Sequence, residues 1–329
     1  MEEAHRRCRE RYGLPPEPPR HPGGKECRIC FHRCRLGPGE RGYCGLPRER
    51  VESPPPASTK TAYLTQYYDP LPTNCVAGWV CPGGTGAGYP RYACCAGPER
   101  GYRNLAVFFH ACNFNCLYCQ NWHFRRIPHL APTSVSDLAA RAGGRTSCIC
   151  YFGGDPGPQV PYALRVSREA RRNRAGDILR ICWESNGGMS PSLLRAVARV
   201  TLESGGCVKL DLKAFHPRTH LALTGVENRQ TLDSLRYLAS LIPQRPDPPF
   251  LVASTLLVPG YVDADEVGSL ARLLASLDPR IPYTLLAFQP EFYLDDLPPT
   301  SWQLARACLR AAREAGLTRV RLGNVHLIS

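Results

Sequence analysis

From residue 104 onward, short apolar runs alternate with amphipathic stretches, a pattern typical of repeated βα units. The apolar runs are nearly continuous, as expected for strands buried on both faces. They predict strands at 105–111, 147–153, 178–184, 207–213, 251–258, 283–289 and, more weakly, 319–325. The amphipathic stretches predict helices at 134–143, 190–206, 228–241, 263–277 and 301–316. Six or seven such units imply an α/β fold, a partial or full (β/α) barrel whose chemistry lies at the C-terminal ends of its strands.

The first 103 residues have a different pattern. Residues 1–50 are polar and rich in Arg and Cys, and residues 51–103 are rich in Pro, Gly and Cys. We therefore expect three parts: a Cys-rich metal-binding segment over 1–50, an insert over 51–103 and the barrel over 104–329. No run of eighteen apolar residues occurs, and no apolar stretch follows the N-terminal charges. These features predict a cytoplasmic protein without a membrane span or a secretory signal.

The chain has 17 cysteines, which in a protein without a secretory signal indicates metal thiolates rather than disulfides. Directly after the strand at 105–111 come Cys112, Cys116 and Cys119, a CxxxCxxC motif. Three thiolates on one short loop can hold three irons of a 4Fe-4S cluster and leave the fourth iron open. A zinc site is the alternative, with His110 or His123 as the fourth ligand.

This motif, with the aromatic Tyr118 before its last cysteine, resembles that of the radical S-adenosylmethionine (radical SAM, AdoMet) enzymes. Within them the chain is similar to the pyruvate formate-lyase activating enzyme and to its relatives called AmmeMemoRadiSam proteins. The resemblance runs from about residue 26 to the end. It is also carried by the stretches CRICFHRCRLGPGERGYCG (27–45), DLKAF (211–215), STLLVPG (254–260), DLPPT (296–300) and GNV (323–325).

The resemblance implies that AdoMet chelates the open iron through its amino and carboxylate groups. It also implies AdoMet contacts from residues at the ends of successive strands: Tyr118, Gly153, Gly154, Asp155, Pro156, Glu184, Ser185, Asn186, Asp211, Lys213 and Gln289. Gln289 replaces a histidine that is frequent in the family, so a neutral amide stands where an imidazole would contact the cofactor. From the residues themselves, Lys209, Asp211 and Lys213 alternate and share one face of a strand. If that face points into the barrel, a charged ligand or partners must neutralise the three charges.

The remaining cysteines form several groups. The C-x2-C-x3-C-x9-C series of Cys27, Cys30, Cys34 and Cys44 predicts a second metal site, for zinc or a second iron–sulfur cluster, with free thiols as the alternative. The insert cysteines could form another site, line a cavity at the barrel mouth or be incidental. Those in apolar strands are expected to be small core residues, namely Cys148, Cys150, Cys182 and Cys207.

The family reaction is reductive cleavage of AdoMet to a 5′-deoxyadenosyl radical, which abstracts hydrogen from the substrate. The net charge of +13 suits an acidic protein partner, so we expect a protein or peptide substrate and an electron donor such as flavodoxin or ferredoxin. Our specific hypothesis is C-methylation of a protein residue, because the chain also resembles cobalamin-assisted enzymes that methylate methyl-coenzyme M reductase. The alternatives are activation of a glycyl-radical enzyme, nucleic-acid modification, suggested by charge alone, and a non-catalytic electron carrier.

Overall fold

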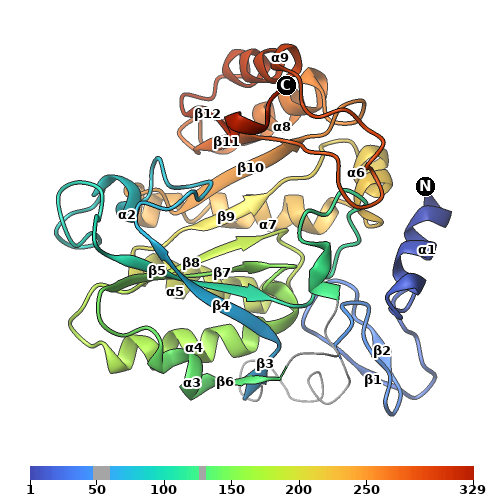
Figure 1. The fold of residues 1–329 in the computed structure, drawn as a ribbon, viewed down its shortest axis with the longest axis horizontal. Helices are drawn as coiled ribbons and strands as arrows, with labels where there is room; N and C mark the ends of the chain where they lie inside the picture. Colours follow the sequence, from blue (N-terminus) through green and yellow to red (C-terminus); the bar gives the residue numbers. More distant parts are fainter. Residues whose placement is uncertain (47–59, 126–130) are drawn as a thin grey trace.

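A computed structural model describes residues 1–46, 60–125 and 131–329, and its centre is one eight-stranded sheet (Figure 1). Seven of the strands are parallel neighbours in chain order, and β4 joins antiparallel beside β5. Along the sheet they are β12 (Val320–Gly323), β11 (Tyr283–Ala287), β10 (Leu251–Leu257), β9 (Val208–Asp211), β8 (Arg180–Ser185), β7 (Thr146–Gly153), β5 (Arg103–Phe109) and β4 (Leu64–Pro70).

The α/β prediction is confirmed, and the barrel is partial. Within the described ranges, β4 and β12 are the two edges of the sheet and do not pair with each other. All seven predicted strands are present, each within a few residues of its expected bounds. They bury apolar side chains such as Leu105, Val107 and Ile149, which are fully shielded from solvent. Burial of each such side chain contributes about 1.5–3 kcal/mol, so the strands hold the barrel wall together.

The helices cover the outside of the sheet, with α3, α4 and α5 towards one edge and α8 and α9 towards the other (Figure 1). All five predicted helices are present. Ser134 and Asp263 cap α3 and α8 by accepting backbone N–H groups, and Gly205, at a φ of 77°, ends α5. The helices are α3 (Val135–Ala140), α4 (Val160–Asn173), α5 (Pro191–Ser204), α6 (Pro217–Thr224), α7 (Arg229–Ala239), α8 (Ala264–Leu277) and α9 (Trp302–Glu314).

The N-terminal segment lies at the C-terminal ends of the strands, where Figure 1 shows it in dark blue. It contains α1 (Glu2–Arg11) and the hairpin of β1 (Lys25–Glu26) and β2 (Arg35–Leu36). It docks on the loop after β8, since the Phe31 N–H donates to the Gly188 carbonyl at 3.3 Å and the Ser190 N–H to that of Ile29 at 2.8 Å. The Cys-rich segment is therefore a neighbour of the strand ends.

The segment predicted as an insert contributes to the same sheet through β4, and its remaining part lies at the opposite, N-terminal ends of the strands. This part carries the short α2 (Pro82–Thr85). The expected boundary at 50/51 falls outside the described residues. A two-stranded ladder of β3 (Thr61–Ala62) and β6 (Thr133–Ser134) completes the strands. No helix of the described chain is long and apolar enough to cross a membrane.

Candidate functional site

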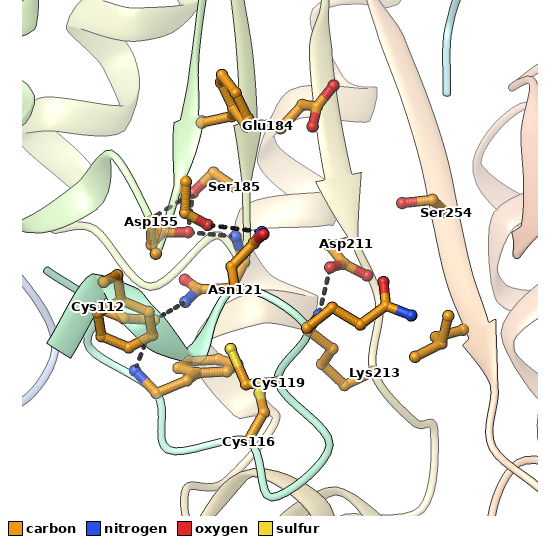
Figure 2. A pocket seen from close by; sticks show the side chains of 18 of the residues that line it. Cys112, Cys116, Cys119, Asn121, Asp155, Glu184, Ser185, Asp211, Lys213 and Ser254 are labelled. Atoms are coloured by element: carbon orange, nitrogen blue, oxygen red, sulfur yellow. Dashed lines mark hydrogen bonds and ion pairs between the residues drawn. The ribbon is translucent and has the colours of Figure 1, made fainter. Parts of the chain in front are cut away.

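A cavity of about 260 Å³ opens at the C-terminal ends of the strands, and the three motif cysteines lie in its wall (Figure 2). The loop that carries them follows β5 directly, and Cys112 is three residues beyond the end of that strand. Cys112 and Cys116 are buried and Cys119 is half-buried. Burial raises the pKa of the Cys116 thiol to about 12, and it raises that of Cys112 as well. Metal binding requires thiolates, so these cysteines need a positive group beside them in order to lose their protons.

At this loop, as elsewhere among the described residues, no three Cys, His, Asp or Glu side chains are placed to hold a single metal ion. A cluster places each thiolate on a different iron, so its ligands need not converge. His110, one of the two candidates for a fourth zinc ligand, instead lies 3.4 Å from the Thr65 hydroxyl through its Nε2. The zinc alternative thus gains no support.

The end of β7 brings its backbone very close to the cysteine loop. Gly153 has a φ of 112°, which favours glycine, and a Cβ on Gly154 would lie 2.3 Å from the Ala111 carbonyl oxygen. The Asp155 N–H donates to that same carbonyl at 2.8 Å. Close packing between the end of β7 and the segment that follows β5 therefore requires both glycines. As a result, the backbone at the end of β7 lies next to the cavity.

The Asp155 carboxylate turns back towards β8. It accepts hydrogen bonds from the Asn186 N–H at 2.7 Å, the Gly157 N–H at 2.6 Å and the Ser185 hydroxyl at 3.1 Å. Burial is the main effect on this group and raises the pKa of Asp155 to about 6. Its side chain thus positions the β7 and β8 loops relative to each other.

The loop after β8 contacts the cysteine loop directly. Asn186 donates from Nδ2 to the Asn113 Oδ1 at 2.8 Å, and the same Nδ2 lies 3.8 Å from the Cys112 sulfur. Glu184, nearer the middle of the barrel, accepts from the Lys209 ammonium at 2.7 Å. The predicted Glu184, Ser185 and Asn186 therefore all line the cavity.

Asp211 and Lys213 form an ion pair in the cavity wall, drawn as a dashed contact in Figure 2. The Lys213 ammonium lies 5.7 Å from the centre of the Tyr118 ring. The other carboxylate oxygen of Asp211, Oδ1, is buried without a partner among the described residues. Such an acceptor costs free energy unless a ligand donates to it. Lys209 lines the same cavity, so the prediction that these three charges share an inward face is confirmed.

Most of the predicted AdoMet residues line this cavity, and two do not. Gln289 donates from its amide to the Leu327 carbonyl at 2.7 Å, and neither it nor Pro156 is part of the cavity wall. Asn121, Arg125 and Ser254 also line the cavity and were not predicted from the sequence. Asn121 belongs to the cysteine-motif stretch CNFNCLYCQNW (112–122), and Ser254 begins STLLVPG (254–260). These two stretches were the available sequence signal. Arg125 is buried, and its Nε and Nη1 have no partner in the described part of the chain.

The four N-terminal cysteines lie together beside this loop. A Cβ on Gly42 would lie 3.5 Å from the Cys44 sulfur and 4.0 Å from that of Cys34, and the Cys27 N–H donates to the Cys34 carbonyl at 2.8 Å. Cys30 is buried and pairs through its backbone with Met189. A metal site at these cysteines stays a prediction.

The family model that describes the radical SAM superfamily matches residues 106–274. The chain belongs to this superfamily. As a radical SAM protein it is an enzyme that uses a 4Fe-4S cluster and AdoMet, which confirms these two predicted cofactors. The cavity fits them, because it combines three thiols on one loop with an ammonium group and with buried polar atoms that have no partner within the described ranges.

This radical SAM enzyme is 32% identical over 165 residues to an isethionate sulfite-lyase activating enzyme of Oleidesulfovibrio alaskensis, covering 49% of this chain and 48% of that protein. It is also 32% identical to a putative glycyl-radical enzyme activating enzyme of Methanocaldococcus jannaschii, covering 56% of this chain and 67% of that one. The chain thus spans about half the length of the isethionate sulfite-lyase activating enzymes it matches. A domain of a pyruvate-formate lyase-activating enzyme from Bacteroides vulgatus superposes on 53% of this chain and 98% of its own, with 19% identity and a TM-score of 0.43.

Proposed function

We propose that this radical SAM enzyme abstracts a hydrogen atom from a residue of a protein partner, as an activating enzyme does. The observation that carries the proposal is the meeting of the three-cysteine loop, the glycine-rich end of β7 and the Asp211–Lys213 pair in one cavity. The names of the relatives, which are activating enzymes, support the choice of a protein partner. Because the match covers only about half the length of the isethionate sulfite-lyase activating enzymes, it supports the class of reaction but not the identity of the partner.

Cys112, Cys116 and Cys119 would hold three irons of the cluster. Bound AdoMet would supply a 5′-deoxyadenosyl radical for hydrogen abstraction. Lys213 would neutralise the carboxylate of AdoMet as a point charge, and the free oxygen of Asp211 would accept a hydrogen bond from a hydroxyl or amino group. The buried cysteine loop and the N-terminal segment beside it would exclude water from the reacting atoms.

An acidic partner and an acidic electron donor would both suit the excess of 41 basic over 28 acidic residues. A flavodoxin or ferredoxin is the donor class we propose. Nucleic acid remains a lesser alternative, because it rests on net charge alone. A steep fall in binding affinity as salt rises would be required to support it.

Our hypothesis of C-methylation with cobalamin is not supported by the names of the curated relatives reported above, which point to activation. The two reactions leave different products. Hydrogen abstraction alone yields 5′-deoxyadenosine, whereas methyl transfer from AdoMet yields S-adenosylhomocysteine as well. Cobalamin is therefore required only by the methylation reading.

The deciding experiment incubates the anaerobically reconstituted enzyme with AdoMet, a reductant and a candidate glycyl-radical enzyme. The proposal predicts 5′-deoxyadenosine and a persistent glycyl-radical signal in the electron paramagnetic resonance spectrum of the partner. The Cys116→Ser variant should yield neither product. The matched control is Cys308→Ser, which replaces a buried cysteine of α9 far along the chain and should yield both. S-adenosylhomocysteine together with a methylated partner residue would overturn activation in favour of methylation.

A further inference from the structure

A second cavity, of about 140 Å³, lies deeper in the partial barrel, towards the N-terminal ends of the strands. The loop of residues 73–83 contributes to its wall from the insert. Phe152, Glu184 and Lys209 line both this cavity and the first one, at the C-terminal ends of the strands, which we call the AdoMet cavity. The second cavity is therefore next to the candidate active site, on the side away from the cysteine loop.

Six cysteines line this second cavity, which we call the thiol chamber: Cys75, Cys81, Cys148, Cys150, Cys182 and Cys207. Cys148 and Cys150 are two residues apart on β7, so they share a face. Cys182 of β8 lies in register beside Cys150, and it packs in one cluster with Cys207. Cys75 and Cys81 pack against the same group from the insert. None of the six forms a disulfide.

The strand cysteines were expected to be small core residues, and they are largely buried as expected. Their surroundings go beyond that expectation, because a buried cation lies among them. The Lys209 ammonium, on a side chain that is 2% exposed, lies 2.9 Å from the Cys150 sulfur and 3.2 Å from the Cys75 sulfur. Neutral thiols are weak acceptors, whereas thiolates or cluster sulfurs accept strongly from an ammonium group.

The other buried cation of the chamber is already neutralised. Arg180 donates two hydrogen bonds to Glu99, at 2.6 Å and 2.7 Å, and both side chains are almost fully buried. Among the described residues, Lys209 has only the partly exposed Glu184 as a carboxylate partner. The chamber therefore combines six soft ligands with an ammonium group directed at sulfur.

We propose that the thiol chamber binds a second iron–sulfur cluster, held by Cys182, Cys207 and two of the other four cysteines. Soft thiolates select iron–sulfur clusters, zinc and Cu(I). Within the described residues no group of three such side chains is placed to hold a single ion, and the same is true at the Cys112 loop. Hydrogen bonds to sulfur, such as those Lys209 can donate, are a known means of tuning a cluster. The proposal stands on the chamber alone and does not depend on the activating function.

The test measures iron and sulfide in the anaerobically purified full chain. A Cys112→Ser/Cys116→Ser/Cys119→Ser variant should retain both. Adding Cys182→Ser and Cys207→Ser to it should lower iron and sulfide per chain at least twofold. Adding Cys308→Ser instead, the matched control for loss of a buried thiol, should leave both unchanged. Equal iron and sulfide with and without the Cys182→Ser/Cys207→Ser pair, or zinc in place of iron, would overturn the proposal.

A second measurement needs no substitution and covers the case in which the variants do not fold. In Mössbauer spectra of the ⁵⁷Fe-enriched wild-type chain, AdoMet should shift the signal of one cluster and leave a second signal of the cubane or rhombic type unchanged. A spectrum in which every cluster signal responds to AdoMet would overturn the proposal. It would leave the activating function intact, because that function is tested by the products.

Discussion

The buried pair of Glu99 and Arg180 gives a quantitative test of how the insert is fastened to the barrel. Glu99 lies in the insert and Arg180 opens β8, and their side chains are 0% and 2% exposed. Glu99 also accepts from the Ser147 hydroxyl at 2.6 Å and from the Cys94 N–H at 2.8 Å. Replacing it in Glu99→Gln removes the charge but keeps the shape, so Arg180 becomes an uncompensated buried cation.

Breaking one side of a buried ion pair costs about 3–5 kcal/mol. For 329 residues, at about 2.1 cal/mol/K per residue, the entropy of unfolding is about 0.7 kcal/mol/K. Glu99→Gln should therefore lower the melting temperature by about 4–7 °C, measured by circular dichroism at pH 7. The matched control is Glu203→Gln, because Glu203 pairs with Arg171 at 3.4 Å on the surface. That change should cost less than about 1 kcal/mol, or about 1 °C.

The effect has a defined pH dependence. Burial alone would raise the pKa of Glu99, but the hydrogen bonds and charge of Arg180 lower it below the ordinary value of a glutamate. A carboxylate with a lowered pKa in the folded state stabilises the fold above its unfolded pKa of about 4.3, and this contribution is lost as the pH falls through the folded value. The deficit of Glu99→Gln should therefore shrink in acid. A melting temperature within 1 °C of wild type at pH 7 would refute the reasoning.

Three further predictions concern the AdoMet cavity. Lys213→Met should weaken AdoMet binding to the reconstituted enzyme at least tenfold by equilibrium dialysis, since a charge-assisted contact is worth about 1.5–3 kcal/mol, and unchanged binding would contradict the role of Lys213. Gly154→Ala should lower the iron content, because its Cβ would lie 2.3 Å from the Ala111 carbonyl, whereas Gly97→Ala, with nothing within 4 Å, should not. Burial raises the pKa of Asp155 to about 6, so the folded state binds this proton more tightly than the unfolded state. Stability should then fall as the pH rises from about 4 to 6, and Asp155→Asn should flatten that part of the curve of melting temperature against pH.

The sequence predicted the parallel strands well, because strands buried on both faces are apolar throughout. It missed β4, whose LTQYYDP alternates with polar residues inside a Pro- and Gly-rich segment. That strand is stabilised by its pairing with β5 rather than by local preference. Its position at the sheet edge is a property of the tertiary structure.

The continuous apolar character of the parallel strands also explains what the sequence could not predict about the site. A strand that is apolar on both faces does not reveal which residues point into the barrel, so Cys150 and Cys182 were expected to be ordinary core. The structure places both in the wall of the thiol chamber, with the Cys150 sulfur 2.9 Å from the Lys209 ammonium. Asp155 lines the cavity as expected from its motif, but the sequence did not predict that its carboxylate joins the loops after β7 and β8.

The most direct test of the account is AdoMet cleavage by the anaerobically reconstituted chain with dithionite and no partner. The account predicts 5′-deoxyadenosine from the wild type and none from Cys116→Ser, whose loop would lack one of its three cluster ligands. Cys308→Ser should match the wild type, because Cys308 lies on the buried face of α9 and not in the cavity wall. Wild-type protein that holds iron and sulfide and binds AdoMet but forms no 5′-deoxyadenosine, or equal product from Cys116→Ser, would contradict the central claim.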